Sequence, residues 1–521
     1  MAVAPHSLAS QSALAVLREG GNAVEAMVAA AATIAVVYPH MNGIGGDSFW
    51  LMSLERQGMR EVVGVEGCGA AALAVDRRDY ADCIPSRGAA SALTMAGTLS
   101  AWERSLLISR ERLGGKLPLS RLLADAIDYA RHGTPVTASQ HRNTRSKLDE
   151  LAIVSGFSDA FLHDGSAPET GSLFIQPRLA TTLEQLSRGG LRDFYAGDLA
   201  RSLARELQAL GSPLRLADFE RHVAVDRTPL LLEHSHGRVY NMPPPTQGLM
   251  SLMILGMMDR LNGSTRDHMG PDYVHSAVES VKKAFQVRDA HISDPRFMKV
   301  DPATYLTREA LDKMAAGIDM GNAAAWGPGK GPADTVWLGV IDSRGNAVSM
   351  IQSIYHEFGS GVVLPGTGVN WQNRGASFSL ELGHINELAP GKKPFHTLNP
   401  ALAQLHDGRT MVYGNMGGDG QPQSQSAVFT RTVVHGMNPQ DAVSAPRWLL
   451  GRTWGKPSET LKLERRFPEQ TVTQLRARGH EVELLDDFDE ACGHASCAVR
   501  HASGSLEGGA DPRSDGVVAA Y

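Results

Sequence analysis

The feature that most constrains the fold is an abrupt change of pattern at Thr335. Residues 316–334 are rich in glycine, alanine and proline, which is typical of an exposed, flexible connector. Directly after it, apolar residues alternate over 336–340, a turn is predicted at 343–346, and a second strand is predicted over 347–354. The sequence therefore predicts a buried β-hairpin whose first strand begins where a loop ends.

A threonine at the start of a buried strand is ordinarily there because it favours β-structure. Its hydroxyl is a poor nucleophile until a base removes the proton, and a free α-amine on the same residue is such a base, with an unperturbed pKa of about 8. Thr335 gains that amine only if the chain is cut between Asp334 and Thr335. The flexible connector makes such a cut feasible, but both interpretations of Thr335 stay open on the hairpin alone.

A second candidate for catalysis is the pair Gly417-Gly418 in the segment 416–422. Because glycine has no Cβ, its backbone N–H groups can approach a bound molecule closely. Two such donors form an oxyanion hole, which stabilises the negative charge on a carbonyl oxygen under attack. An ordinary turn explains the same dipeptide, so the pair alone assigns no chemistry.

The composition of the 521 residues, with 54 glycines and 20% charged residues, is that of a globular protein. A net charge of -6 argues against a nucleic-acid partner, because phosphate binding needs a basic face. The longest apolar stretch, residues 24–38, contains Glu25 and is too short to span a bilayer, and the first residues lack a secretory signal pattern. Four cysteines are too few for a disulfide scaffold, so a cytoplasmic location without a membrane partner is expected.

No metal or other cofactor is predicted, although two groups of residues have metal-ligand side chains. One group consists of Cys492, His494, Cys497 and His501. Its spacing matches no standard zinc pattern, which favours a local structural role. His234 and His236 have no acidic or thiol partner at useful spacing, which favours a strand end at the surface. The glycine-rich turn at 41–47 lacks the lysine of a phosphate-binding loop.

Two helices are predicted in the first forty residues. Ser7 is expected to cap the first helix and Gly20-Gly21 to end it. Asn22 followed by Glu25 is a capping-box pattern for the second helix, and Pro39 is expected to close it.

Several long motifs, in order along nearly the whole chain, resemble the γ-glutamyltransferase superfamily of N-terminal-nucleophile hydrolases. They are HSLASQSALAVLREGGNAVEAMVAAA (6–31), MNGIGGDSF (41–49), the stretch from DTVWLGV to PGTGV (334–369), MGGDGQPQ (416–423) and NPQDAVSAPRW (438–448). The resemblance implies an α+β fold, an αββα four-layer sandwich. It also implies a precursor that cuts itself into chains 1–334 and 335–521, which form one folded unit.

On this resemblance Thr335 is the nucleophile, and Gly417 and Gly418 hold the oxyanion. Ser353 falls where the family has a second hydroxyl residue near the nucleophile, and a plain strand hydroxyl is the alternative. The partners expected are a small amide substrate, water and the two cleaved chains as a heterodimer, with a dimer of these heterodimers left open.

The substrate-binding positions depart from the γ-glutamyl pattern. Where that pattern has an arginine for the substrate's α-carboxylate, this chain has Glu66, which would repel an anionic ligand; Arg77 and Arg78 lie too far downstream to match. In the segment that holds the α-ammonium group, Arg374 replaces an amide and Ser377 replaces an acid.

A paired serine motif in the family becomes His396-Thr397 here. A guanidinium suits forked binding of a carboxylate, so Arg374 is interpreted as a substrate contact, with a surface ion pair as the alternative. Asn373, His396, Thr397 and Tyr355 are the further candidates.

The pattern resembles the oxamate amidohydrolase branch of the family, which acts in purine breakdown and converts oxamate to oxalate and ammonia. The alternatives are a γ-glutamyl hydrolase or transferase, an acylase with a larger pocket, and a non-catalytic binding protein on the same scaffold.

Overall fold

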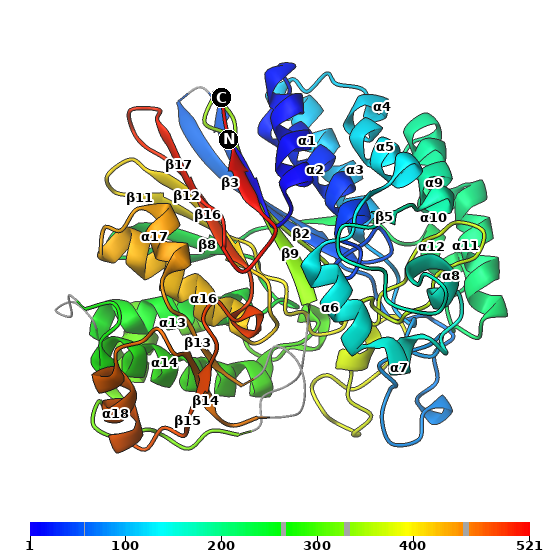
Figure 1. The fold of residues 1–521 in the computed structure, drawn as a ribbon. Coiled ribbons are helices and arrows are strands. Elements are labelled where there is room, and N and C mark those ends of the chain that lie inside the picture. Colours follow the sequence, from blue (N-terminus) through cyan, green and yellow to red (C-terminus); the bar gives the residue numbers. More distant parts are fainter. Residues whose placement is uncertain (57, 262–266, 328–333, 452–457) are drawn as a thin grey trace.

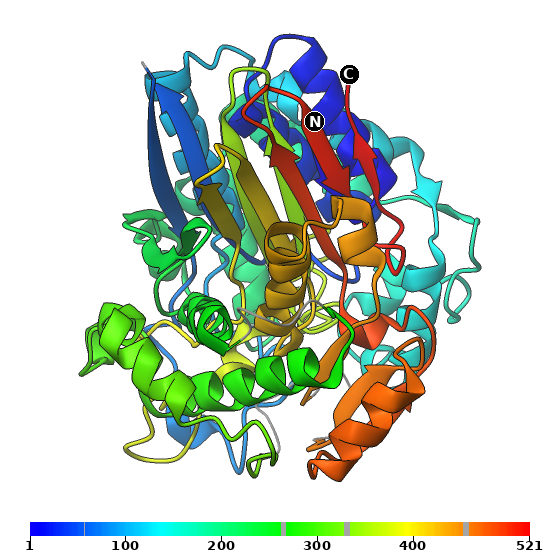
Figure 2. The same cartoon turned by 90° about the vertical axis from the view of Figure 1, so that its left-hand side faces the viewer.

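The structure is a computed structural model that describes residues 1–521 except 57, 262–266, 328–333 and 452–457. Two β-sheets lie face to face, and helices cover the outer face of each (Figures 1 and 2). This arrangement confirms the predicted α+β, αββα architecture. None of the helices in the described ranges is both long and apolar enough to cross a bilayer.

The first sheet places strands from distant parts of the chain side by side. Within the described residues its order is β18 (Val517–Ala519), β1 (Ala2–Ala4), β9 (Asp334–Ile341), β10 (Ala347–Tyr355), β2 (Asp47–Arg56), β3 (Met59–Gly67) and β6 (Val225–Arg227). The predicted hairpin is confirmed as β9 and β10, which are antiparallel and lie between β1 and β2. Strands from both sides of the 334/335 junction therefore share one sheet.

The second sheet mixes the two parts of the chain in the same way. Its order is β17 (Leu506–Gly509), β16 (Ala495–Arg500), β12 (Thr410–Asn415), β11 (Ala401–Leu405), β8 (Gly237–Asn241) and β7 (Leu230–His234). Because β11 pairs with β8, this sheet also crosses the junction. A cut before Thr335 would leave both sheets held together by backbone hydrogen bonds between the two pieces.

Apolar side chains fill the space between the sheets, as the alternation along the strands requires. Those from the first sheet include Phe49, Leu51, Trp337 and Ile351, and those from the second include Leu402, Val412 and Ala498. Strand β10 is buried along its whole length, since it is covered on one face by the second sheet and on the other by helices.

Helices in the first layer pack on the outer face of the first sheet. They include α1 (Ser7–Arg18), α2 (Ala23–Val37), α3 (Thr98–Ile108), α5 (Ala124–His132), α9 (Pro177–Gly189) and α11 (Asp198–Ala209). Helix α2 is buried on every side because it lies between the sheet and other helices, which explains why it is apolar all round. The capping box of Asn22 and Glu25 is confirmed, whereas the cap of α1 is His6 and not Ser7, since His6 Nδ1 accepts from the Leu8 amide.

The layer on the second sheet contains α13 (Gly248–Leu261), α14 (Pro271–His291), α16 (Gly420–Phe429) and α17 (Pro439–Ser444). Helix α16 follows directly on β12 and leads from the Gly417-Gly418 turn into this layer. The turn therefore lies at the end of an inner strand, where its backbone can face the space between the sheets and the loops above them.

Candidate active site

Thr335 lies at the start of β9 and is completely buried. Its Oγ1 atom accepts a hydrogen bond from Nε2 of Gln421 on helix α16, at 3.4 Å. Asp334 is the first residue of the same strand, while its side chain and residues 328–333 of the preceding connector lie outside the described residues. The predicted cleavage point is therefore the junction between the connector and an inner strand.

A β-bulge on β10 lies opposite Thr335. The register shifts between Gln352 and Tyr355, so Ser353 and Ile354 both face the one residue Thr335. The Tyr355 amide donates to Ser353 Oγ at 2.8 Å, and Tyr355 has a φ of +84°, which non-glycine residues rarely adopt. The bulge places Ser353 opposite Thr335 and turns the chain at Tyr355.

The Gly417-Gly418 turn presents two backbone donors near Thr335. Both glycines have positive φ, at 117° and 43°, so a side chain at either position would be strained. In the described part of the chain, neither amide donates a hydrogen bond. The Gly418 carbonyl accepts from the amide of Gln421, the residue whose side chain reaches Thr335. Two free N–H groups on a turn linked to Thr335 through Gln421 suit an oxyanion hole.

Arg374 is the most unusual side chain of the site. It is fully buried in the short helix Arg374–Ser377, and its Nη1 donates to Thr397 Oγ1 at 3.2 Å. Its Nε and Nη2 atoms have no hydrogen-bond partner among the described residues. These two groups form one edge of the guanidinium fork, which matches the two oxygens of a carboxylate. Burial lowers the pKa of Arg374 to about 10, so it stays charged at neutral pH.

The Tyr355 ring supports this guanidinium, with Arg374 Cζ 3.9 Å from the ring centre. Stacking on an aromatic face stabilises a cation without using its N–H donors. The Asn373 side chain, by contrast, is engaged by the protein, since it accepts from the His356 amide at 3.1 Å and donates to the Ser86 carbonyl at 2.8 Å. Asn373 thus holds the loop that carries Arg374.

The structure adds Asp47, which the sequence did not single out. His396 Nε2 lies 2.9 Å from Asp47 Oδ2, and both side chains are fully buried. The other Asp47 oxygen accepts from the amides of Gly69 and Gly97 and from the Gln372 side chain. One feature of the sequence could have pointed to Asp47. It is an acid at the start of an apolar strand, and a buried carboxylate requires a partner.

Burial shifts the two groups of this pair in opposite directions. It raises the pKa of Asp47 to about 7, against the charge of Arg374, and it lowers the pKa of His396 well below its usual range, with a further contribution from Arg374. Both shifts disfavour the charged form, so a neutral imidazole faces an acid that titrates near neutrality. His396 Nδ1 has no partner among the described residues.

Glu66 corrects one expectation. Its carboxylate accepts from Arg227 Nε at 2.7 Å and also pairs with Lys393 Nζ. The expected repulsion of an anionic ligand by Glu66 is therefore wrong, because two cations balance its charge. Arg77 and Arg78 are engaged elsewhere, with the Leu380 carbonyl and with Asp76 respectively.

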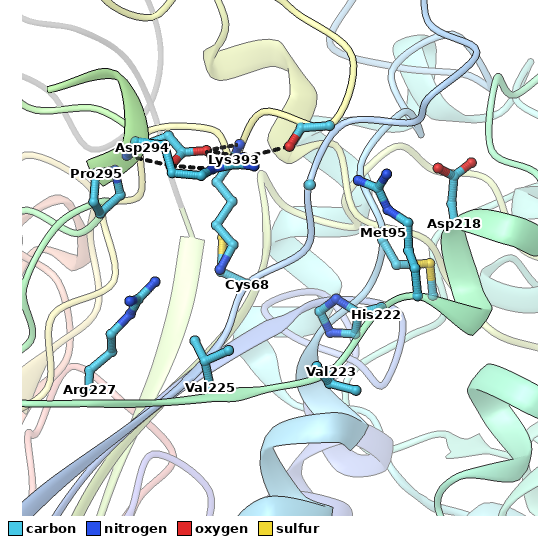
Figure 3. Close-up of a pocket in the computed structure, with 14 residues that line it drawn as sticks. Cys68, Met95, Asp218, His222, Val223, Val225, Arg227, Asp294, Pro295 and Lys393 are labelled. Carbon is cyan, nitrogen blue, oxygen red and sulfur yellow. Dashed lines mark hydrogen bonds and ion pairs between the residues drawn. The ribbon is translucent and has the colours of Figure 1, made fainter.

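A cavity of about 340 Å³ is lined by Cys68, Arg227 and Lys393, among other residues (Figure 3). Cys68 lines this cavity and also lies close to the pair, since Asp47, Cys68 and His396 each have a ligand-type atom within 4.8 Å of the others. Lys393 extends toward Cys68, and Arg227 projects from the chain next to Val225. Both cations that pair with Glu66 therefore line this cavity.

Two triads of residues with metal-ligand side chains occur in the described part of the chain. In Asp47, Cys68 and His396, the Asp47 carboxylate is already hydrogen-bonded to His396 Nε2. In His275, Glu279 and His480, the imidazoles are hydrogen-bonded at 2.8 Å, and Glu279 pairs with Lys282. Since these polar atoms bind protein donors and acceptors, the arrangement assigns no ion to either triad.

The two groups considered from sequence do not converge on one point. Cys492 and Cys497 are buried, and His501 pairs with Glu507 at 3.0 Å near the surface. His234 ends β7 and lies 3.6 Å from Asp259.

A threonine that begins an inner strand, in two stacked sheets between helical layers, defines the class of N-terminal-nucleophile hydrolases. The family model described as gamma-glutamyltranspeptidase matches residues 9–521, so the chain belongs to that family and is a hydrolase. This finding confirms the resemblance inferred from the motifs.

Individual relatives are similar over the full length. The chain is 57% identical over 523 residues to the oxamate amidohydrolase proenzyme of Klebsiella pneumoniae, covering 100% of this chain and 98% of that protein. It is 40% identical to the glutathione hydrolase-like YwrD proenzyme of Bacillus subtilis, and the match covers 99% of this chain and 98% of that protein. The crystal structure of cephalosporin acylase from Bacillus halodurans is similar with a TM-score of 0.90 at 32% identity, covering 100% and 95%.

Proposed function

We propose that this protein is a self-processing threonine amidohydrolase whose substrate is a small amide that carries a carboxylate, oxamate above all. The observation that carries the proposal is the buried Arg374, whose Nε and Nη2 donors are free and whose other nitrogen is held by Thr397. A buried cation with unmet donors calls for an anionic ligand. The 57% identity to an oxamate amidohydrolase proenzyme supports the choice of oxamate.

Processing comes first in the proposed sequence of steps. The Thr335 hydroxyl attacks the carbonyl of Asp334, an N→O acyl shift gives an ester, and water releases the chain 1–334. The chain 335–521 then begins with a free α-amine on Thr335. The two chains stay together as a heterodimer because both sheets contain strands from each of them.

Hydrolysis then uses the same hydroxyl. The α-amine takes the proton of Thr335 Oγ1, which attacks the amide carbonyl of oxamate while the Gly417 and Gly418 amides hold the oxyanion. The protonated amine returns the proton to the leaving nitrogen, and ammonia departs. Water, activated by the same amine, cleaves the oxalyl ester on Thr335 and releases oxalate.

The contacts around Arg374 favour a substrate without an ammonium group. In a γ-glutamyl substrate the α-ammonium would meet this guanidinium, and like charges in a buried site repel. The names of the Bacillus relatives keep a γ-glutamyl hydrolase and an acylase as alternatives to be tested.

The test is a screen of ammonia or amine release from oxamate, glutamine, glutathione, a chromogenic γ-glutamyl anilide and an acyl-lactam. Oxamate is expected to be the preferred substrate, and Thr335→Ala is expected to abolish turnover. Clear turnover of the γ-glutamyl anilide with no activity on oxamate would overturn the substrate assignment. A chain that stays intact and inactive would favour the binding-protein alternative.

A further inference from the structure

The unpartnered nitrogen of His396 needs an explanation. His396 and Asp47 are both completely buried, and the bond between Nε2 and Oδ2 uses one ring nitrogen. The opposite nitrogen, Nδ1, has no partner among the described residues, although buried polar atoms are nearly always satisfied. A molecule that enters the site is the natural partner for it.

The His396 ring lies close enough to Arg374 for the two side chains to interact electrostatically. His396 is adjacent in the chain to Thr397, whose hydroxyl accepts from Arg374 Nη1 at 3.2 Å. Arg374 also acts electrostatically on both Asp47 and His396. A carboxylate on the Arg374 fork therefore lies within the influence of the pair.

The charges of the pocket are balanced only while it is empty. The positive charge of Arg374 faces the negative charge of Asp47, and both are fully buried. A bound carboxylate adds a second negative charge to a site that excludes water, where unpaired charge is strongly disfavoured. A group in the site must then gain a positive charge to balance the ligand.

We propose that the Asp47–His396 pair takes up one proton from solvent when a carboxylate binds to Arg374. The inference rests on the proposed function, in which Arg374 holds the substrate carboxylate. The proton bonds to the lone pair of His396 Nδ1, while Nε2–H keeps its hydrogen bond to Asp47 Oδ2. The new Nδ1–H then donates to the bound anion. Asp47 is in this account a positioning residue that acts through His396.

The surroundings of the pair set the pH range. Burial raises the pKa of Asp47 to about 7, so below this pH the pair already carries its second proton and above it the proton must be taken up on binding. The other ionisable groups nearby are Cys68, whose thiol is kept neutral by burial, the buried Tyr195, and Glu66 with its two cations. Lys393 and Arg227 together exceed the charge of Glu66, and their side chains are partly exposed. If this excess balanced the ligand, no proton would be needed.

Calorimetry on the processed enzyme decides whether binding takes up a proton or whether Lys393 and Arg227 balance the ligand. Glycolate is a suitable probe because it is a small monocarboxylate with no amide to hydrolyse. Its binding enthalpy, measured in buffers of different ionisation enthalpy, gives the number of protons taken up. We expect an uptake that approaches one proton at about pH 8 and falls toward zero at about pH 5.5, with affinity decreasing about tenfold per pH unit above neutrality.

Binding at pH 8 without proton uptake would overturn the inference and leave the Arg374 site intact. No binding of glycolate, together with no competition against oxamate, would overturn the carboxylate site itself and this inference with it. The two failures are therefore distinguishable.

Variants locate the proton. Asp47→Asn is expected to bind glycolate without uptake, because Arg374 alone then balances the charge of the ligand. His396→Asn keeps the Asp47 carboxyl but loses the Nδ1–H donor, and is expected to bind glycolate at least about tenfold more weakly. Cys68→Ser is the matched control, since it changes a neutral neighbour of the pair and is expected to keep the uptake. Uptake that persists in Asp47→Asn, or an unchanged affinity of His396→Asn, would place the proton elsewhere and contradict the proposal. If Asp47→Asn does not fold, the wild type and His396→Asn still give the answer.

Discussion

Tyr355 supports Arg374 from an unfavourable backbone conformation. Its ring centre lies 3.9 Å from the guanidinium carbon, while its φ of +84° lies in the left-handed region. Residues held in such conformations tend to occur at functional sites, where the surrounding structure enforces them. The bulge in β10 that creates this turn also faces Thr335, so one local feature positions groups beside both Thr335 and Arg374.

Replacing the Tyr355 ring is expected to weaken substrate binding selectively. Tyr355→Leu removes the aromatic face beneath Arg374 and should raise KM for oxamate by about 3- to 30-fold, since a cation–π contact contributes about 0.5–2 kcal/mol. Tyr355→Phe keeps the ring and the backbone strain, and should stay within a few-fold of wild type. Steady-state kinetics on both variants check this, and equal losses in the two would show that the hydroxyl and not the ring matters.

Arg374→Lys keeps a positive charge but loses the fork. Because hydrogen bonds to a charged group contribute about 1.5–3 kcal/mol each, losing the geometry of two should lower kcat/KM for oxamate by about 100-fold or more. Self-cleavage is the control, because it does not use the substrate carboxylate. Its extent, measured on a denaturing gel, should be unchanged in Arg374→Lys. Full activity of the Lys variant on oxamate would contradict the assignment of Arg374.

A side chain on the oxyanion turn is expected to reduce kcat. Gly418→Ala forces alanine into a conformation that costs about 1–2 kcal/mol and displaces a donor amide, so kcat should fall by about 100- to 1000-fold. Gly436→Ala is the control, because Gly436 also has a positive φ, of 69°, but no atom lies within 4 Å of the added Cβ. It should lose a little thermal stability and no activity.

The two halves of the site differ in how far they could be predicted from sequence. The hairpin at Thr335 and the turn at Gly417-Gly418 are local patterns, and the structure shows both where they were expected. Asp47 and His396 are separated by 349 residues, so no local pattern reveals that they share a hydrogen bond. The pairing of Glu66 with Arg227 and Lys393 was missed for the same reason, and with it the charge balance of the pocket.

Smaller differences follow from competition between neighbouring groups. His6 caps the first helix in place of Ser7, because its ring nitrogen reaches the Leu8 amide. Asn373 was expected to contact substrate, yet both ends of its amide bind the backbone. Which polar side chains remain free for a ligand depends on contacts that only the folded chain defines.

The central claim is that Thr335, freed as an N-terminus, carries the acyl group. Enzyme quenched with acid during turnover of oxamate can be digested and measured by mass spectrometry. We predict a small chain that begins TVWLGV and bears an oxalyl group on Thr335, and no such species in Thr335→Ala. Rapid turnover with an intact bond between Asp334 and Thr335, or an acyl group on another residue, would contradict the account.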